Sequence, residues 1–171
     1  MNERPTKEEY GLYYEQYISL VPEGDIRELL AQALEENTAV WSALSEEKGL
    51  FRYASGKWSV KEVLGHLIDG ERIMSYRLLR IGRGDPTMLS GFDQDAYVQG
   101  AAFDAVPLAQ LVEEYTVVRR ATLLLLKGLP EEAWSRAGSA NNSVLTTRAL
   151  AYIIAGHERH HMRILKERYL G

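Results

Sequence analysis

Hydrophobic residues recur every three or four positions along most of the chain, which is the period of an amphipathic α-helix. No run alternates between apolar and polar residues for long enough to predict a strand. A short leading helix, rich in tyrosine, is expected over Thr6–Tyr17. Four longer helices are expected after it: one from Asp25 through Leu44, one from Ser59 to a stop at Gly82 and Gly84, one from Pro107 to Gly128, and one from Ser143 or Thr146 almost to Gly171.

The second long helix has the clearest start signal. Ser59 and Glu62 form the S-x-x-E pattern of a capping box, in which each side chain satisfies a backbone N–H group that the first turn leaves free. Trp58 precedes the cap and can pack against Val63 as a hydrophobic staple. We therefore expect this helix to begin immediately after Ser59.

Two connections separate the later helices. The segment Gly84–Asp104 is long for a compact domain, because loops of about 20 residues are uncommon and usually functional. It has room for one helical turn around Asp95–Gln99. The other connection, Glu131–Asn142, ends in a turn-like run of small and polar residues.

Four long helices, each with an apolar stripe, predict an all-α four-helix bundle with a long loop between its second and third helices. The length of 171 residues suits one domain over residues 1–171, with its core in about residues 20–168. In such a bundle, sites are expected between facing helices.

Composition excludes several classes of function. The net charge is -4, with no basic stripe of the kind that binds nucleic acid. No apolar run is long enough to span a bilayer. The opening MNERPTKEEY has no apolar stretch of a signal peptide, so residence in the cytoplasm is expected. The absence of cysteine means that any transition metal must be held by imidazole and carboxylate.

The four histidines lie in only two places, His66 in the second helix and His157, His160 and His161 in the last. At about 100° per residue, His157 and His161 differ by roughly 40° around the helix axis and lie one turn apart. Two histidines of one helix can share a zinc ion at this spacing. His160 points aside, toward solvent or a helix neighbour, and its role stays open.

The pair His157 and His161 lies on the apolar side of the last helix, and His66 lies on the apolar stripe of the second. Three imidazoles on inward faces of two helices can meet at one ion and leave a coordination position for water or substrate. The alternative is that each histidine is an ordinary core residue with no ligand role. We expect a metal site formed by His66, His157 and His161.

Supporting roles rest on weaker signals. Asp69, three residues after His66, can orient an imidazole or act as an exposed helix charge. Asp93 and Tyr97, in the long loop, can serve as acid, base or substrate contacts, although capping of the loop is the simpler role for Asp93. Glu158 is expected to face solvent. Four arginines can bind a carboxylate of a low-molecular-weight thiol, but a solvated helix charge is the favoured interpretation for each: Arg72, Arg77, Arg148 and Arg159.

Two motifs resemble the DinB-like (YfiT-like) family of bacterial metalloenzymes. They are KWSVKEVLGHLIDGER around His66 and GHERHHMRIL around His157 and His161, and the segment GFDQDAYV is similar to one branch of the family. The resemblance covers about residues 20–168. It implies a four-helix bundle with nickel or zinc on three histidines, which correspond to His66, His157 and His161.

The resemblance also implies a class of reaction. Family members with an assigned activity are mostly S-transferases or isomerases that use bacillithiol, mycothiol or a related low-molecular-weight thiol, and related bundles often form homodimers. We therefore expect a metal-dependent S-transferase acting on a small-molecule substrate. The alternatives are a metal-dependent hydrolase and a non-catalytic, stress-related metal-binding module.

Overall fold

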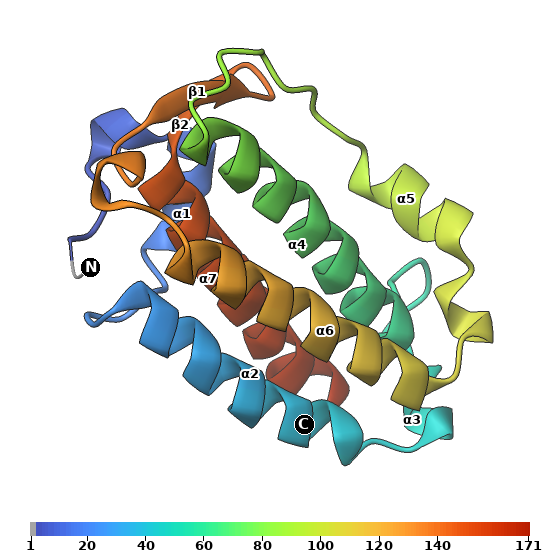
Figure 1. The fold of residues 1–171 in the computed structure, drawn as a ribbon. Helices are drawn as coiled ribbons and strands as arrows, with labels where there is room; N and C mark the ends of the chain where they lie inside the picture. Colours follow the sequence, from blue (N-terminus) through green and yellow to red (C-terminus); the bar gives the residue numbers. More distant parts are fainter. Residues whose placement is uncertain (1–2) are drawn as a thin grey trace.

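A computed structural model, which describes residues 3–171, shows a four-helix bundle (Figure 1). Helices α2 and α4 each pack against both α6 and α7, so α2 and α4 occupy opposite corners of the bundle. This arrangement confirms the expected fold. The four long helices are α2 (Ile26–Ser42), α4 (Val60–Gly82), α6 (Leu108–Lys127) and α7 (Thr147–Ile164).

Shorter elements precede, connect and follow the long helices. The connection between α4 and α6 contains a helix of two turns, longer than the single turn expected there, which Asp93 caps. The shorter elements are η1 (Lys7–Glu9), η2 (Leu12–Tyr14), α1 (Glu15–Ile18), α3 (Glu46–Gly49), α5 (Gln94–Ala101), η3 (Phe103–Ala105), η4 (Glu131–Ala133), β1 (Ala137–Ala140), β2 (Ser143–Thr146) and η5 (Leu165–Tyr169).

The expectation that the chain contains no strand is wrong. Strand β1 pairs antiparallel with β2, with Ala140 opposite Ser143. Asn141 and Asn142 between them have φ angles of 51° and 58°, as a type I′ hairpin turn requires. Four-residue strands offer too few alternating positions to be recognised by pattern. The hairpin leads directly into α7, because the side chain of Thr146 accepts a hydrogen bond from Ala149 N as its N-cap.

Both ends of the chain depart from the expected helices. The segment Thr6–Tyr17 is not one helix, because Tyr10 is extended and forms a bridge with Leu145 of β2. Helix α7 ends at Ile164, and the π-helical turn η5 replaces its expected continuation. For Tyr10, the contact with the distant strand β2 overrides the local helical period.

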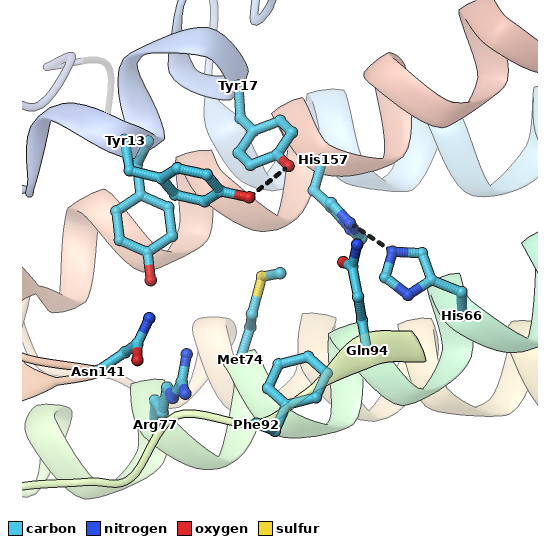
Figure 2. A pocket seen from close by; sticks show the side chains of 10 residues that line it. Tyr13, Tyr17, His66, Met74, Arg77, Phe92, Gln94, Asn141 and His157 are labelled. Atoms are coloured by element: carbon cyan, nitrogen blue, oxygen red, sulfur yellow. Dashed lines mark hydrogen bonds between the residues drawn. The ribbon is translucent and has the colours of Figure 1, made fainter. Parts of the chain in front are cut away.

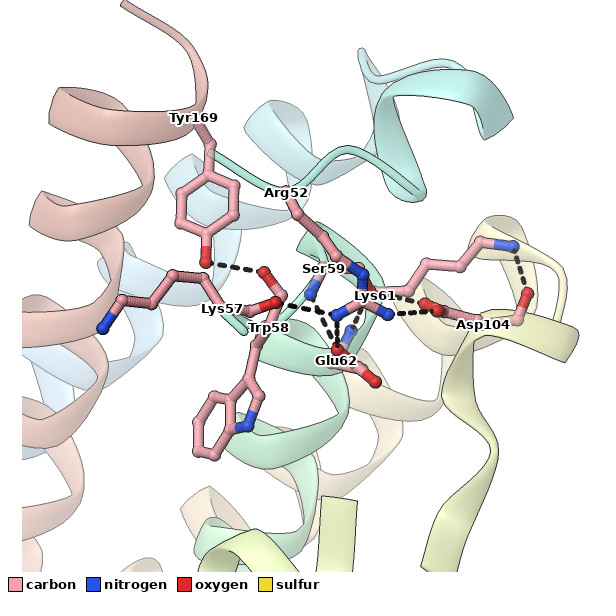
Figure 3. Close-up of polar contacts among 8 residues, drawn as sticks. All are labelled: Arg52, Lys57, Trp58, Ser59, Lys61, Glu62, Asp104 and Tyr169. Carbon is pink, nitrogen blue, oxygen red and sulfur yellow. Dashed lines mark hydrogen bonds and ion pairs between the residues drawn. The ribbon is translucent and has the colours of Figure 1, made fainter. Parts of the chain in front are cut away.

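A polar network anchors the start of α4 (Figure 3). The predicted capping box is confirmed, because Ser59 Oγ accepts from Glu62 N at 3.0 Å and Glu62 Oε2 accepts from Ser59 N at 2.8 Å. Asp104 accepts a bond from Ser59 Oγ, and the Tyr169 hydroxyl donates to Trp58 O at 2.9 Å. These contacts tie the start of α4 to both the long connection and the C-terminal turn.

The buried apolar residues form two clusters along the bundle. On α7, His157 lies between Ile154 of one cluster and Met162 of the other. On α4, His66 lies within the second cluster, between Leu64 and Leu67. Within residues 3–171, no helix has both the length and the apolar character needed to cross a membrane.

Candidate metal centre

Three histidines meet inside the bundle where α4 faces α7, and we call them the trihistidine cluster. His66 comes from α4, and His157 and His161 come from successive turns of α7. One ligand-capable atom from each side chain lies within 4.8 Å of the other two. His66 Nε2 and His157 Nε2 are 3.0 Å apart (Figure 2). The structure thus brings together the three histidines that the spacing selected.

This geometry fits one divalent ion. Two imidazole nitrogens bound to a tetrahedral zinc ion at about 2.0–2.1 Å lie about 3.3 Å apart, close to the 3.0 Å between His66 and His157. The other two pairs of nitrogen atoms are up to 4.8 Å apart, and side-chain shifts on the order of 1 Å would bring them to the distance that a shared ion requires. Three protein ligands leave at least one coordination position for another molecule.

Two glycines allow the close approach of the elements around the cluster. A Cβ atom on Gly70 of α4 would lie 3.2 Å from Cε1 of His157, and one on Gly156 of α7 would lie 2.1 Å from the carbonyl oxygen of Tyr17. The second distance is far below van der Waals contact, so only glycine fits where α1 crosses α7. The crossing sets the Tyr17 ring edge-on to His157, with centroids 5.3 Å apart.

Burial keeps the cluster uncharged at neutral pH. It lowers the pKa of His66 to about 4. Burial, followed by the charges of His66 and His160, lowers the pKa of His161 to about 3. Burial and the neighbouring histidines hold the pKa of His157 well below its ordinary value. Neutral imidazole is the form that binds metal, so the ligands need not lose a proton at neutral pH.

Aromatic rings surround the imidazoles. The Trp58 ring, fixed beside the start of α4, lies 4.8 Å from the His66 ring. His160 contacts the Tyr17 ring at 5.5 Å and is only partly buried. Among the described residues, the group able to share an ion consists of His66, His157 and His161 and does not include His160.

Two cavities adjoin the trihistidine cluster from different sides. One, of about 190 Å³, is lined by His66 and His157 together with residues from the N-terminal segment, α4, the start of α5 and the hairpin turn (Figure 2). The other, of about 230 Å³, is lined by His161, Trp58 and Tyr169 among others. We call them the His157 cavity and the His161 cavity.

Comparison with known families places this geometry in context. The model of the DinB superfamily matches residues 29–165, a range that includes the whole trihistidine cluster. The chain belongs to the DinB superfamily. No curated protein sequence matches it.

A solved structure gives the DinB superfamily chain a structural relative. YfiT from Bacillus subtilis, described as "a probable metal-dependent hydrolase with an unusual four-helix bundle topology", superposes with a TM-score of 0.71. The match covers 97% of this chain and 91% of that chain, at 15% sequence identity. At this identity the likeness establishes the shared fold.

Among residues 3–171, none of the weaker sequence candidates of this DinB superfamily chain forms a hydrogen bond or ion pair with the trihistidine cluster. Asp69 is within 3.9 Å of Arg72, and within residues 3–171 no hydrogen bond joins it to the cluster. Asp93 Oδ1 accepts from Asp95 N at 2.9 Å, as an N-cap of α5. Tyr97 is 44% exposed and packs against Phe92. The capping of α5 is observed, whereas the catalytic or orienting roles of Asp69, Asp93 and Tyr97 stay predictions.

Sequence reasoning missed most of the residues that line the His157 cavity. The tyrosine-rich segment has no predicted role in the site. For Arg77 the favoured interpretation, a solvated helix charge, is wrong because the side chain is buried, and the alternative of a carboxylate contact stays a prediction. No local pattern indicates the remaining residues, because they come from elements that meet only in the folded chain. The missed residues are Tyr13, Tyr14, Tyr17, Met74, Phe92, Gln94 and Asn141.

A second buried polar group lies next to His157, and it corrects the expectation for Glu158. Glu158 is 2% exposed and accepts a hydrogen bond from Arg119 Nη1 at 3.0 Å and another from the Tyr115 hydroxyl. Arg119 also donates to Glu71 from Nε and Nη2, at 2.8 and 2.9 Å. We call these four residues the Arg119 cluster. Glu158 points into the interior of the bundle, where the long side chains of Arg119 and Tyr115 reach it from α6, which the period of α7 alone could not reveal.

Proposed function

We propose that His66, His157 and His161 hold one divalent transition metal, nickel or zinc, and that the protein is a metal-dependent S-transferase. One observation carries the proposal. Three neutral imidazoles converge within 4.8 Å, and their only hydrogen bond among residues 3–171 joins His66 to His157. Buried nitrogen atoms that mainly face one another are better explained by a shared cation than by core packing.

The donor set determines what the site can do. A divalent ion on neutral imidazoles supplies Lewis acidity, which lowers the pKa of a thiol or water at its open position. The chain supplies the three ligands and surrounds them with the rings of Trp58 and Tyr17. These rings limit the access of bulk water and strengthen electrostatic interactions at the site.

Two features favour group transfer from a thiol. The His157 and His161 cavities reach the cluster from different sides, which suits a reaction between two substrates. The chain has no cysteine, so the nucleophilic sulfur must belong to a separate low-molecular-weight thiol, as in the relatives that use such thiols. The second substrate is then a small electrophile.

Hydrolysis is the second candidate, and the description of YfiT as a probable metal-dependent hydrolase favours it. Water would replace the thiol, and one of the two cavities would then have no substrate to hold. The two reactions differ in a simple requirement. Transfer depends on added thiol, whereas hydrolysis of esters or amides proceeds without it.

The metal site is tested first, by metal analysis of protein purified without a polyhistidine tag. We expect one nickel or zinc ion per chain. The variant His161→Ala should lower metal affinity at least about 100-fold, whereas the matched control His160→Ala, one position away, should change it less than about threefold. Equal effects of the two variants would refute the trihistidine site.

The reaction is tested with metal-loaded protein, a panel of thiols that includes bacillithiol and mycothiol, and electrophiles such as epoxides and activated aryl halides. We expect conjugation that depends on both the metal and the thiol. Ester or amide turnover without thiol would instead support the hydrolase. If His66→Ala lowers stability and no reaction is found, the protein is a non-catalytic metal-binding module.

Two further expectations accompany this function. Residence in the cytoplasm matches a reaction that uses an intracellular thiol. A homodimer is expected by analogy with related bundles, and sedimentation of the purified protein tests it. Asp69, Asp93 and Tyr97 are proposed as supporting residues, for which substitution should reduce turnover without releasing the metal.

A further inference from the structure

A buried arginine faces the His157 cavity. Arg77 of α4 is 4% exposed and lines the cavity (Figure 2). Its Nη2 donates to Ser90 O at 2.8 Å, and its guanidinium lies 6.0 Å from the centre of the Phe92 ring. Within residues 3–171, no carboxylate oxygen lies within 4.0 Å of its nitrogen atoms. Arg77 is therefore a buried cation without an ionic partner.

Such a residue costs free energy unless another interaction compensates for its lost hydration. A guanidinium carries five N–H donors, and among the described residues Arg77 meets uncharged partners, the Ser90 carbonyl and the Tyr14 hydroxyl, which leave some of these donors unused. In residues 3–171, the buried side-chain nitrogen and oxygen atoms that lack a hydrogen-bond partner are Thr38 Oγ1 and Trp41 Nε1, and no atom of Arg77 is among them. The unpaired donors of Arg77 therefore reach the open space of the cavity.

The surroundings of Arg77 favour an anion. Tyr14 and Asn141 add uncharged polar groups to this end of the cavity, and none of the lining residues found in the described chain is acidic. Burial raises the pKa of the Tyr14 phenol, and the positive charge of Arg77 opposes that rise. Tyr14 is thus a neutral hydrogen-bond donor at neutral pH, beside a cation.

The helix geometry determines the length of the ligand. Arg77 follows His66 by eleven positions on α4, which separates their Cα atoms by about 16 Å. Helical side chains lean toward the N-terminus, so the long arginine side chain extends toward His66. On the order of 8–10 Å then remains between the imidazoles and the guanidinium. Met74 and Phe92 lie in this interval (Figure 2).

We propose that Arg77 binds the carboxylate of a substrate whose reactive group lies at the trihistidine cluster, with an apolar spacer of about six carbon atoms against Met74 and Phe92. A carboxylate suits Arg77 because a guanidinium can hold both of its oxygens at once. The inference that this molecule is a substrate rests on the proposed function. The anion site itself is a property of the chain without metal.

The test uses metal-free protein, so that the imidazoles cannot attract the anion through an ion. Hexanoate and 1-hexanol have the same chain length and differ mainly in charge, and calorimetry measures the binding of each. We expect hexanoate to bind at least about ten times more tightly. Arg77→Met should remove this preference. Arg77→Lys should keep part of it, because lysine retains the positive charge but lacks the paired N–H donors of the guanidinium.

A matched control comes from the same helix. Arg72 is half exposed and pairs with Glu114, so Arg72→Met should leave the preference unchanged. Circular dichroism and zinc stoichiometry verify the fold of each variant. Equal binding of hexanoate and 1-hexanol to the unmodified protein would overturn the proposal, and this result does not depend on whether Arg77→Met folds. A preference for hexanoate that survives in folded Arg77→Met would overturn it too.

A second arm finds which substrate carries the carboxylate. With zinc-loaded protein, 6-mercaptohexanoate should bind more tightly than both hexanoate and 6-mercaptohexan-1-ol if the carboxylate belongs to the thiol. If its thiol group adds nothing, the carboxylate belongs to the electrophile. Loss of the zinc site would be seen in metal analysis alone, so failure of the proposed function and failure of the Arg77 site have different readouts.

Discussion

Two polar clusters lie side by side in the bundle, and His157 and Glu158 place them on adjacent positions of α7. In the Arg119 cluster each charged group has a partner, because Arg119 donates to both Glu71 and Glu158. Burial lowers the pKa of Arg119, but the two carboxylates outweigh it and hold the pKa well above its ordinary value. The trihistidine cluster contains three groups of one kind and has no carboxylate partner among residues 3–171.

The two clusters differ in whether their polar groups are paired within the protein, and this difference indicates different roles. A buried network whose donors and acceptors match one another needs no further molecule and fixes the packing of α4, α6 and α7. The trihistidine cluster is not matched in this way, because among the described residues its imidazole nitrogens make one hydrogen bond, between His66 and His157, and the remaining nitrogens can bind another group. The cavity beside the Arg119 cluster has a volume of only about 10 Å³. The trihistidine cluster adjoins the larger His157 and His161 cavities. The first cluster therefore stabilises the fold, and the second remains the proposed metal site.

The largest effect on stability is expected when the ion pairs of the Arg119 cluster are broken. Arg119→Met should lower the free energy of unfolding by about 3–5 kcal/mol, because it leaves Glu71 and Glu158 buried without a counter-charge. Urea denaturation of the metal-free protein measures the loss. The triple variant that also carries Glu71→Gln and Glu158→Gln should recover much of it. A loss under about 1 kcal/mol for Arg119→Met alone would show that the cluster is not a closed ionic unit.

A smaller effect is expected from acid on the trihistidine cluster. The folded-state pKa of His66 is about 4, below its value of about 6.5 in an unfolded chain. The unfolded chain therefore takes up the proton first, and stability falls as the pH drops from above 6.5 toward 4. His66 alone should account for up to ~3 kcal/mol of this loss. Denaturation of metal-free protein at pH 7.5 and 4.5, compared with His66→Gln, measures it, and equal losses in both proteins would contradict the prediction.

The smallest effect concerns the crossing that positions Tyr17 beside the histidines. Gly156→Ala places a Cβ atom 2.1 Å from the Tyr17 carbonyl oxygen, so we expect a loss of about 1–3 kcal/mol from overpacking. The matched control is Gly100→Ala on α5, where a Cβ atom meets nothing within 4 Å and helix propensity should improve stability slightly. Thermal melting compares the two. Similar melting temperatures for the two variants would show that α1 can move away from the new Cβ atom without loss of stability, and would contradict the prediction.

Much of the fold and the choice of the three candidate histidines follow from local chemistry. The capping box at Ser59 and Glu62 locates the start of α4, and the helical period predicts four amphipathic helices. The i, i+4 spacing of His157 and His161 selects that pair over His160, because relative direction around one helix depends only on separation in the chain. These features need no knowledge of distant segments.

The remaining features depended on tertiary structure. The period of α7 gives the direction of Glu158 but not that α6 brings Arg119 to meet it. Likewise, the period of α4 cannot show that the hairpin turn and the N-terminal tyrosines enclose Arg77. Whether a charge is buried, paired or free to bind a ligand is decided by residues far away in the sequence. The sequence alone therefore determined the helices and the ligand spacing, and only the folded chain decided which polar groups are satisfied and which face an open cavity.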